Sequence, residues 1–208
     1  MNIYLLRHGE TDWNREGRIQ GHTDIPLNQN GRMQIVQIAK GLAGICPNID
    51  LIICSPLLRA CESAKIAARN LNYPIEHIVV ESLFIERCFG EAEGMTAKER
   101  AERYPNYQYS DTGYRFPGIE EYENLIKRAN SAFQKIVTAY KDKENILVVS
   151  HGAILAAVIT VVTDGKITYF SDVLSLDSGS LYRVRYTDRV VELARYGINE
   201  SKFVDIHF

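Results

Sequence analysis

Apolar and polar positions along this chain follow two alternating patterns. Apolar residues recur at helical spacing over residues 31–42 and 120–140, and residues 153–162 form an apolar run that predicts a buried helix, because it is too short to cross a bilayer. Shorter apolar runs of the length typical of buried strands occupy residues 3–6, 51–54, 78–80 and 146–150. Strands that alternate with helices predict an α/β fold, a three-layer α/β/α sandwich with a mainly parallel sheet.

Two segments depart from this alternation. Residues 181–186 and 190–195 flank Thr187-Asp188 and predict a closing antiparallel hairpin, which would make the sheet mixed. Residues 96–118 carry four tyrosines and two prolines, which is typical of a lid-like insertion over a site and equally of an ordinary solvated loop. Because no repeat, linker or low-complexity stretch interrupts the chain, we expect a single domain over residues 1–208.

The second strand is followed directly by a helix start signal. Ser55 is a favourable N-cap residue and Pro56 suits the first helical position, so a helix is predicted to begin there. Arg59 then falls in the first turn, where free backbone N–H groups and the positive end of the helix dipole attract anions. An arginine at this place can bind phosphate through two parallel hydrogen bonds. The alternative is a surface arginine paired with Glu62 or Glu86.

Composition narrows the class of protein. The chain has 208 residues and a formal net charge of −2 at pH 7, which argues against nucleic acid as a partner, because nucleic-acid binding favours a basic excess. A small anionic substrate remains compatible, since a few arginines in one pocket hardly change the total. Charge appears too early in the N-terminal MNIYLLRHGE for a signal peptide, and four cysteines without a Cys-x-x-Cys pair are typical of reduced thiols. We therefore expect a cytoplasmic protein that is not bound to a membrane.

Two strand ends share a chemical pattern. The first predicted strand ends in Arg7-His8-Gly9, and the fourth ends in Ser150-His151-Gly152. Open α/β sheets bind their ligands at the carboxyl ends of strands, and the glycine after each histidine is expected to let a ligand approach the backbone. One such ending alone is most often a structural histidine at a turn, but two in one small protein indicate a site. Glu86, on a glycine-rich segment after the third strand, is weak evidence by itself.

These pieces, taken in chain order, resemble the motifs of one enzyme family. The segment LLRHGETDWNREGRIQGHTDIPLNQNGRMQ resembles the opening of the histidine phosphatase (phosphoglycerate mutase-like) superfamily, and the resemblance recurs in SPLLRACESAK, ERCFGEAEG, PGIEE and VVSHG. It covers almost the whole chain, whose size and spacing are similar to those of the short bacterial broad-specificity phosphatases. The resemblance implies a phosphoglycerate mutase-like fold and a phosphatase that hydrolyses small phosphorylated metabolites through a phosphohistidine.

The resemblance also implies a role for each matching residue. His8 is the implied nucleophile, and Glu86 is the implied proton donor to the leaving oxygen, which can later act as a base toward water. Cationic groups around the transferred phosphoryl group would offset its charge, so that neither a metal nor another cofactor is needed. The residues implied to hold the phosphoryl group or substrate are Arg7, Asn14, Gln20, Gly21, Arg59, His151 and Gly152.

Departures from the usual family strings leave the identity of the substrate open. Ser63, Ala92 and Ala156 stand where Thr, Trp and Arg are common, and PGIEE replaces PGGES. None of these changes removes a catalytic group. Positions 92 and 156 are expected to shape the pocket, as are residues 96–118, so we expect them to determine which phosphorylated metabolite is accepted.

Two alternative functions are considered. A bisphosphoglycerate-dependent phosphoglycerate mutase would use the same phosphohistidine, but such mutases are usually longer between the acid and the second histidine. Here that interval runs only from Glu86 to His151, which favours hydrolysis. A catalytically inactive binding module on the same fold should have lost part of the motif set, which is intact in this chain. The sequence leaves the oligomeric state open, with a homodimer among the alternatives.

Overall fold

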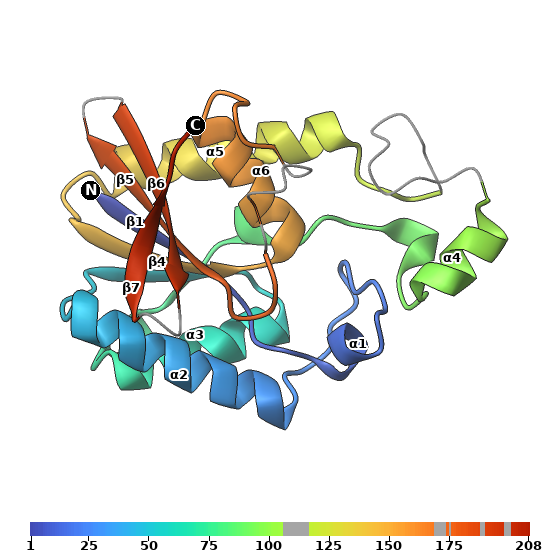
Figure 1. Cartoon of the computed structure of the whole chain (residues 1–208), viewed down its shortest axis with the longest axis horizontal. Coiled ribbons are helices and arrows are strands. Elements are labelled where there is room, and N and C mark those ends of the chain that lie inside the picture. Colours follow the sequence, from blue (N-terminus) through green and yellow to red (C-terminus); the bar gives the residue numbers. More distant parts are fainter. Residues whose placement is uncertain (106–116, 169–173, 175, 188–189, 198–200) are drawn as a thin grey trace.

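The computed structural model describes residues 1–105, 117–168, 174, 176–187, 190–197 and 201–208 (Figure 1). Within them the α-helices are α1 (Asp12–Arg15), α2 (Gln29–Ile45), α3 (Leu58–Asn70), α4 (Ala97–Arg103), α5 (Tyr122–Ala139) and α6 (Gly152–Val162). The strands are β1 (Asn2–Arg7), β2 (Leu51–Cys54), β3 (Val79–Val80), β4 (Asn145–Ser150), β5 (Leu181–Thr187), β6 (Val190–Gly197) and β7 (Lys202–Ile206). Short 3₁₀ helices cover Ile75–His77, Ser82–Phe84 and Gly90–Ala92.

The strands of the described residues form one mixed sheet in the order β3-β2-β4-β1-β5-β6-β7. The first four in that order are parallel, and β5, β6 and β7 continue the sheet in antiparallel pairs. The predicted α/β sandwich on a mixed sheet is confirmed, as is the β5–β6 hairpin. The antiparallel part is larger than predicted because β7 adds an edge strand, whose side chains are all exposed or half-buried and therefore show no apolar run.

Helices cover both faces of the sheet, with α2 and α3 on one face and α5 and α6 on the other (Figure 1). Side chains alternate along a strand, so neighbouring residues of β1 enter different cores. Leu6 packs with Ile35 of α2 in one core, whereas Leu5 packs with Leu155 of α6 in the other. The apolar run 153–162 is buried in α6 as predicted, and no helix among the described residues is long and apolar enough to cross a membrane.

The strands β1 and β4 lie side by side at the centre of the sheet, and the chain leaves them in opposite directions. After β1 it passes to α2 on one face, and after β4 it passes to α6 on the other. This arrangement opens a crevice at the carboxyl ends of the two strands, where α/β sheets bind ligands. In the register of this pair Arg7 lies opposite Ser150, so His8 and His151 follow at the same edge.

The start of α3 differs from the prediction. The helix begins at Leu58, three residues after Ser55, and Leu57 holds the N-cap position without a capping side chain. The backbone N–H of Leu58 donates instead to Oδ1 of Asp24 at 2.7 Å. The hydroxyl of Ser55 lies 2.6 Å from Nε2 of His151, so a tertiary contact uses the side chain that the local sequence favours as a helix cap.

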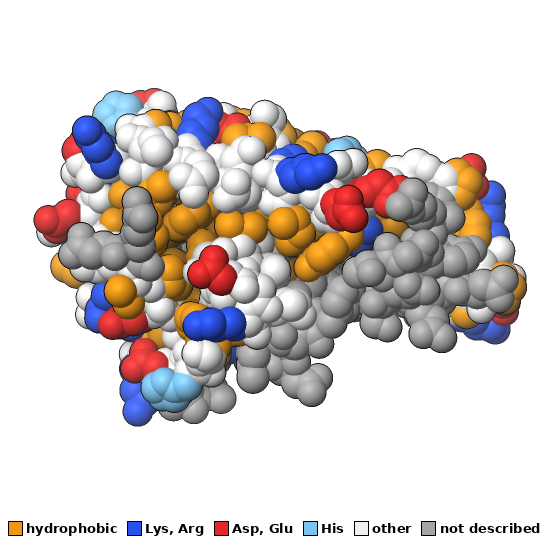
Figure 2. Space-filling view, turned by 90° about the horizontal axis from the view of Figure 1, so that it is seen from above, with side chains coloured by type: hydrophobic (Ala, Val, Ile, Leu, Met, Phe, Trp, Pro, Cys, Tyr) orange, Lys and Arg blue, Asp and Glu red, His pale blue; other side chains and the backbone are white. Residues whose placement is uncertain are grey.

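Only part of the predicted lid-like insertion, residues 96–118, can be compared with the structure. It begins with α4, which has a capping box between Thr96 and Glu99 and lies beyond the end of the sheet (Figure 1). Residues 106–116 lie outside the described residues, so the lid stays a prediction. On the face shown in Figure 2, basic and acidic side chains are scattered around a group of hydrophobic side chains among the residues described there.

Candidate active site

The two predicted histidines lie next to each other at the carboxyl edge of β1 and β4. The backbone N–H of His8 donates to the carbonyl oxygen of Ser150 at 2.9 Å, which extends the parallel pairing by one residue. The imidazole rings of His8 and His151 are 5.2 Å apart between centroids and meet edge to face. Parallel pairing thus brings together two residues that are far apart in the sequence.

The imidazole of His8 is held in one orientation inside the protein. It is 2% exposed, and its Nδ1 lies 2.7 Å from the carbonyl oxygen of Gly9. Because a carbonyl oxygen can only accept a hydrogen bond, Nδ1 carries the proton and Nε2 carries the lone pair. Burial lowers the pKa of His8 well below 6.5, and the positive charges of Arg59 and Arg7 lower it further. A neutral ring with a free lone pair is the form that can act as a nucleophile.

The glycine after His8 lies against a second backbone segment. A Cβ atom at Gly9 would lie 2.3 Å from the carbonyl oxygen of Gly31 in α2, so glycine is needed here because two backbones meet. The N–H of Gly9 donates to Oγ of Ser63, which donates in turn to the carbonyl of Arg59. Packing of the loop on α2 and α3 therefore fixes the position of His8.

The second histidine has different surroundings. His151 is fully buried, and its Nε2 lies 2.6 Å from the hydroxyl of Ser55. Its Nδ1 is buried and has no hydrogen-bond partner in the part of the chain that the structure describes. Burial lowers the pKa of His151 well below 6.5, with further contributions from the charges of Arg59 and Arg7. Both imidazoles of the pair are therefore neutral near pH 7.

Arg59 is a buried cation rather than the surface residue of the alternative interpretation. It is 0% exposed, and its terminal nitrogens donate to the carbonyl oxygens of Thr23 at 2.9 Å and Gly21 at 2.7 Å. Burial lowers the pKa of Arg59 to about 10, with Glu86 opposing that shift, so the side chain keeps its charge at pH 7. Its Nε is buried and makes no hydrogen bond within the described residues.

The loop that anchors Arg59 is itself held by Glu93. This carboxylate accepts hydrogen bonds from the backbone N–H groups of His22, Thr23 and Phe89 and from the hydroxyl of Thr23. The backbone of Gly21 has a positive φ of 53°, and a Cβ atom there would lie 2.0 Å from Oε1 of Glu93. Gly21 is therefore required by both conformation and space.

Glu86 lies at the amino end of α6. Its Oε1 accepts from the backbone N–H groups of Arg87 at 2.9 Å and of Ala153 and Ile154 at 3.2 Å each. These two helix N–H groups belong to the first turn, where the helix dipole favours a carboxylate. Oε2 has only a 3.4 Å contact with the N–H of Ala153, which leaves this oxygen for exchange of a proton.

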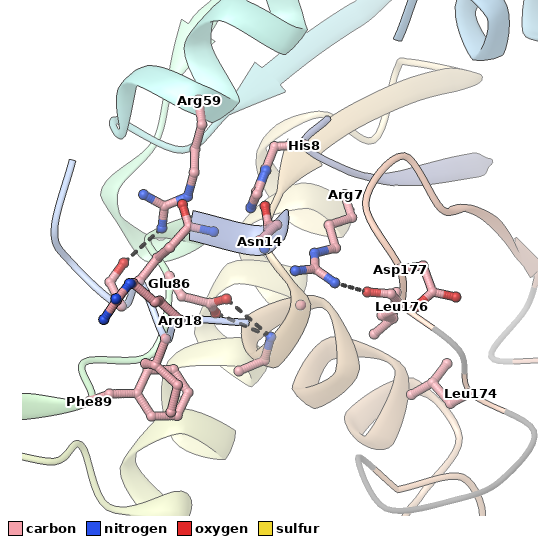
Figure 3. A pocket seen from close by; sticks show the side chains of 15 residues that line it. Arg7, His8, Asn14, Arg18, Arg59, Glu86, Phe89, Leu174, Leu176 and Asp177 are labelled. Carbon is pink, nitrogen blue, oxygen red and sulfur yellow. Dashed lines mark hydrogen bonds between the residues drawn. The ribbon is translucent and has the colours of Figure 1, made fainter. Parts of the chain in front are cut away.

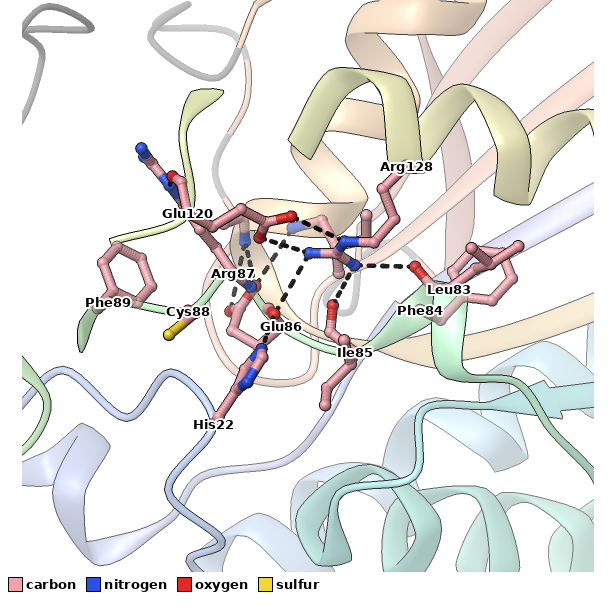
Figure 4. Close-up of polar contacts among 12 residues, drawn as sticks. His22, Leu83, Phe84, Ile85, Glu86, Arg87, Cys88, Phe89, Glu120 and Arg128 are labelled. Carbon is pink, nitrogen blue, oxygen red and sulfur yellow. Dashed lines mark hydrogen bonds and ion pairs between the residues drawn. The ribbon is translucent and has the colours of Figure 1, made fainter. Parts of the chain in front are cut away.

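A buried ion pair fixes the segment that carries Glu86 (Figure 4). Arg128 of α5 pairs with Glu120 at 2.7 Å and donates to the carbonyl oxygens of Leu83, Ile85 and Glu86. Glu120 belongs to the PGIEE string, to which the sequence analysis assigned no role. The side chains of both partners are less than one-fifth exposed, so removal of either leaves a partly buried charge without its partner.

A cavity of about 530 Å³ opens beside His8 (Figure 3). His151 does not line it but packs against the ring of His8. The predicted site residues that line the cavity are Arg7, His8, Asn14, Gln20, Gly21, Arg59, Glu86 and Gly152. Its other lining residues were not predicted from the sequence: Arg18, Ile19, Phe89, Ala153, Leu174, Leu176 and Asp177.

The lining residues that sequence reasoning missed fall into two groups. Arg18 lies in the opening motif between Asn14 and Gln20, and it donates to the carbonyl of Gly94 at 2.7 Å, so the motif itself was the available signal. Leu174, Leu176 and Asp177 precede β5 and lie far from any motif in the sequence. The guanidinium of Arg7 donates to the carbonyl oxygen of Leu176. No local pattern marks that segment, and only the fold brings it to the cavity.

Two other carboxylates near the motifs make hydrogen bonds or ion pairs with neighbouring side chains. Glu10 accepts from Asn28 at 2.7 Å, and Glu91 pairs with Arg103 at 3.0 Å. Neither lines the cavity. In the part of the chain that the structure describes, no three His, Cys, Asp or Glu side chains are grouped so that they could hold a metal ion.

Comparisons with known proteins agree with this geometry. The family model of the histidine phosphatase superfamily (branch 1) matches residues 3–199. The chain belongs to this superfamily. The uncharacterized phosphatase PhoE of Bacillus subtilis (strain 168) is 35% identical to it over 197 residues, which are 95% of this chain and 94% of that protein. The solved structure of Bacillus stearothermophilus YhfR has a TM-score of 0.79 and 28% identity, and the match covers 91% of this chain and 93% of that one.

The similarity extends to a plant enzyme. A metal-independent phosphoserine phosphatase of Arabidopsis thaliana is 36% identical over 169 residues, which are 79% of this chain and 69% of that protein. Together with PhoE, it favours the phosphatase interpretation over the mutase. The sequence-based identification of the family, the fold and the phosphatase class is confirmed.

Proposed function

We propose that this protein hydrolyses small phosphomonoesters by transfer of the phosphoryl group to Nε2 of His8 and then to water. The supporting observation is a group of buried side-chain nitrogens that have no hydrogen-bond partner among the described residues: Nε of Arg7, Nε of Arg59 and Nδ1 of His151. A buried donor left without a partner costs about 1–3 kcal/mol, so their gathering beside His8 favours an anionic ligand. The oxygens of a phosphoryl group can accept from several donors at once.

In the first half-reaction the lone pair of His8 Nε2 attacks phosphorus while the bond from phosphorus to the ester oxygen breaks. Glu86 gives its proton to that oxygen through Oε2, and the substrate leaves as an alcohol. Arg7 and Arg59 offset charge on the three non-bridging oxygens, and the product on the enzyme is an N-phosphohistidine. His151 donates from Nδ1, because the hydroxyl of Ser55 can donate to its Nε2.

In the second half-reaction water attacks the phosphohistidine. The carboxylate of Glu86 takes a proton from this water, phosphate forms, and His8 regains its lone pair. Asn14 and Gln20 line the same cavity, and Oε1 of Gln20 is buried without a partner. We assign these two side chains, together with the backbones of Gly21 and Gly152, to binding of the phosphate or the adjacent part of the substrate.

We extend the proposal to the kind of substrate and to the chemistry needed. A cavity of about 530 Å³ is of the size that binds small molecules, so we propose a phosphorylated metabolite rather than a nucleic acid or a membrane lipid. The arginine side chains supply the charge stabilisation, so the reaction is proposed to be independent of metal ions. We also propose that residues 1–208 act as one domain in the cytoplasm.

Phosphate release in the presence of EDTA tests this function. The purified protein is incubated with p-nitrophenyl phosphate, phosphoserine and 3-phosphoglycerate, and in parallel with 3-phosphoglycerate plus 2,3-bisphosphoglycerate. We expect phosphate release that survives the chelator and little interconversion of 2- and 3-phosphoglycerate. Loss of activity in EDTA with recovery on a divalent metal would contradict the metal-independent mechanism, and faster interconversion than hydrolysis would identify a mutase.

A further inference from the structure

Two cysteines lie in contact beside the proposed active site. Cys54 is the last residue of β2, and Cys61 is the fourth residue of α3. Their sulfur atoms are 3.7 Å apart. A disulfide requires about 2.05 Å between the sulfur atoms, so closure needs a movement of only ~1.7 Å. Both thiols are free in this structure.

The surroundings of Cys61 favour its reaction with an oxidant. Its side chain is partly exposed, whereas Cys54 is buried. The hydrogen bond from Cys54 lowers the pKa of Cys61 to about 7, and the charge of Lys65 adds to this effect, while burial and Asp24 oppose it. The pKa of Cys54 is raised by the same contact and by burial. Cys61 is therefore the nucleophilic thiol of the pair, and Cys54 is the resolving thiol, which attacks the oxidised sulfur of Cys61.

The pair is connected to the proposed phosphoryl site through Ser55. The thiol of Cys61 donates to the carbonyl oxygen of Ser55 at 3.1 Å. The side chain of Ser55 lies 2.6 Å from Nε2 of His151. Arg59 lies between the two cysteines in the chain, and its guanidinium lines the cavity. A bond between Cys54 and Cys61 would close a short loop that contains both Ser55 and Arg59.

We propose that Cys54 and Cys61 form a reversible disulfide that slows phosphoryl transfer. The effect on activity rests on the proposed function, whereas formation of the bond does not. The carbonyl of Ser55 loses its hydrogen bond when the sulfur of Cys61 turns toward Cys54. Displacement of reacting groups by about 1 Å can cost up to 10²-fold in rate, so the oxidised protein is expected to be at least about tenfold slower.

The chemistry is balanced with a hydroperoxide as the oxidant. The Cys61 thiolate attacks one oxygen of hydrogen peroxide, the O–O bond breaks, and the released hydroxide leaves as water after it takes a proton. The Cys61 sulfenic acid that forms is then attacked by the sulfur of Cys54. A second water leaves and the S–S bond forms. Two thiols are oxidised by two electrons, one peroxide is reduced to two waters, and an excess of a small dithiol reverses the reaction.

Peptide mapping tests formation of the bond. Trypsin cuts after Arg59, so Cys54 and Cys61 fall in different peptides, residues 41–59 and 60–65. Cys46 shares the first peptide, so the experiment uses Cys46→Ala/Cys88→Ala protein, in which the pair is the only source of a disulfide within the chain. After peroxide treatment and thiol blocking we expect the two peptides to be joined, and to separate again in dithiothreitol. Two blocked, separate peptides from folded protein would overturn the proposal.

Phosphatase activity of the same samples tests whether the disulfide slows phosphoryl transfer. We expect the peroxide-treated protein to release phosphate from p-nitrophenyl phosphate at least about tenfold more slowly, with recovery in dithiothreitol. The matched control, Cys61→Ser in the same background, is expected to keep the basal rate and to resist peroxide. A joined peptide without loss of rate would overturn the proposal, and so would equal loss in the Cys61→Ser control.

The design separates this proposal from the proposed function. If the reduced protein released no phosphate from any substrate, the proposed function would fail, but the joined peptides would still report on the thiol pair. Circular dichroism and the thermal midpoint of each variant show whether it is folded. Cys54→Ala protein gives a second measurement, because without the resolving thiol the Cys61 sulfenic acid should accumulate and react with dimedone. Absence of that adduct would contradict Cys61 as the nucleophilic thiol.

Discussion

The strand ends of β1 and β4 carry the same His-Gly string but hold their imidazoles in different ways. The Nδ1 of His8 is fixed by the neighbouring carbonyl of Gly9, and its ring lines the cavity. Nε2 of His151 lies 2.6 Å from the hydroxyl of Ser55, the residue after β2, and Nδ1 has no hydrogen-bond partner among the described residues. Nε2 of His8 therefore carries a lone pair, whereas Nδ1 of His151 can carry a proton.

The same local pattern therefore leaves the two rings with different hydrogen-bond partners. Both rings are neutral because burial lowers the pKa of each, with Arg59 and Arg7 adding to the effect. The partner at the second nitrogen then decides which ring can attack and which can donate. Five experiments test whether the two rings differ in this way.

His8→Ala should have the largest effect. Removal of a covalent nucleophile removes the pathway, so we expect turnover to fall by at least about 10⁴-fold and the acid-labile phosphoenzyme to disappear. Rapid acid quench with a ³²P-labelled substrate measures both. If the pure variant kept a rate near that of the wild type, the nucleophile would have to be another residue.

Glu86→Gln should slow poor leaving groups more than good ones. The amide keeps the shape of the side chain but cannot donate a proton, and an acid contributes about 10²–10⁴-fold. An alkyl phosphate should lose most of this factor in phosphoenzyme formation, whereas p-nitrophenyl phosphate should lose little, because nitrophenolate leaves readily without a proton.

Rapid mixing isolates the first half-reaction of Glu86→Gln, since the second step is common to all substrates. Glu91→Gln is the matched control, because Glu91 is exposed and pairs with Arg103 outside the cavity. Equal losses for both leaving groups would assign Glu86 a binding or structural role.

His151→Ala tests the donating member of the pair. Removal of one donor to a developing oxyanion costs about 10²–10³-fold, so this variant should be slow but should still form the phosphoenzyme. The same acid-quench assay compares it with His8→Ala. Complete loss of phosphoenzyme in folded His151→Ala protein would contradict the proposal that His8 is the nucleophile and His151 only a hydrogen-bond donor.

Arg128→Lys tests the segment that carries Glu86. Lysine keeps the charge beside Glu120 but cannot reach three carbonyl oxygens in the planar geometry of arginine. Because misplacement of a catalytic group by about 1 Å can cost up to 10²-fold, we expect a loss of about ten- to a hundredfold for alkyl phosphates.

The leaving-group dependence of Arg128→Lys distinguishes positioning from a general loss of structure. A smaller loss for p-nitrophenyl phosphate is expected, because that substrate does not need the acid. Arg185→Lys is a control, since Arg185 pairs with the exposed Glu192 on the antiparallel side of the sheet. If Arg128→Lys slowed all substrates equally, Arg128 would be a structural residue only.

The pH dependence of stability tests the buried, neutral state of both rings. In the unfolded chain each histidine takes up a proton below about pH 6.5, whereas in the folded protein both stay neutral because their pKa values are lowered. The unfolded state then binds more protons, so the stability contributed at neutral pH is lost as the pH falls below 6.5. The slope is about 1.4 kcal/mol per pH unit for each histidine.

Urea unfolding between pH 7 and pH 5 measures this slope in the wild type and in His151→Asn protein. His151→Asn should remove about half of the pH dependence of the free energy of unfolding that the two histidines cause. His77→Asn, a change at a residue in the exposed 3₁₀ helix, should leave it unchanged. An unchanged slope in His151→Asn would show that the ring is not kept neutral by the fold.

Strands and helices whose apolar residues repeat with a clear period could be predicted from the sequence. The interior runs of β1, β2 and β4 are apolar throughout because both faces of a central parallel strand are covered. The sequence also indicated where the chemistry lies, because two predicted strands end in His-Gly and five segments of the chain resemble the motifs of one family. The edge strand β7 was not predicted, because a strand at an exposed edge of the sheet needs no apolar pattern.

Contacts between polar groups of different elements could not be predicted in the same way. Ser55 carries the signal of a helix cap, yet its hydroxyl lies against His151. The pairing of Glu120 with Arg128, the approach of the segment before β5 to Arg7, and the contact of Cys54 with Cys61 follow from packing between elements. A periodic pattern reports how a residue relates to its own helix or strand. Contacts between side chains depend instead on how those elements pack, which no local pattern records.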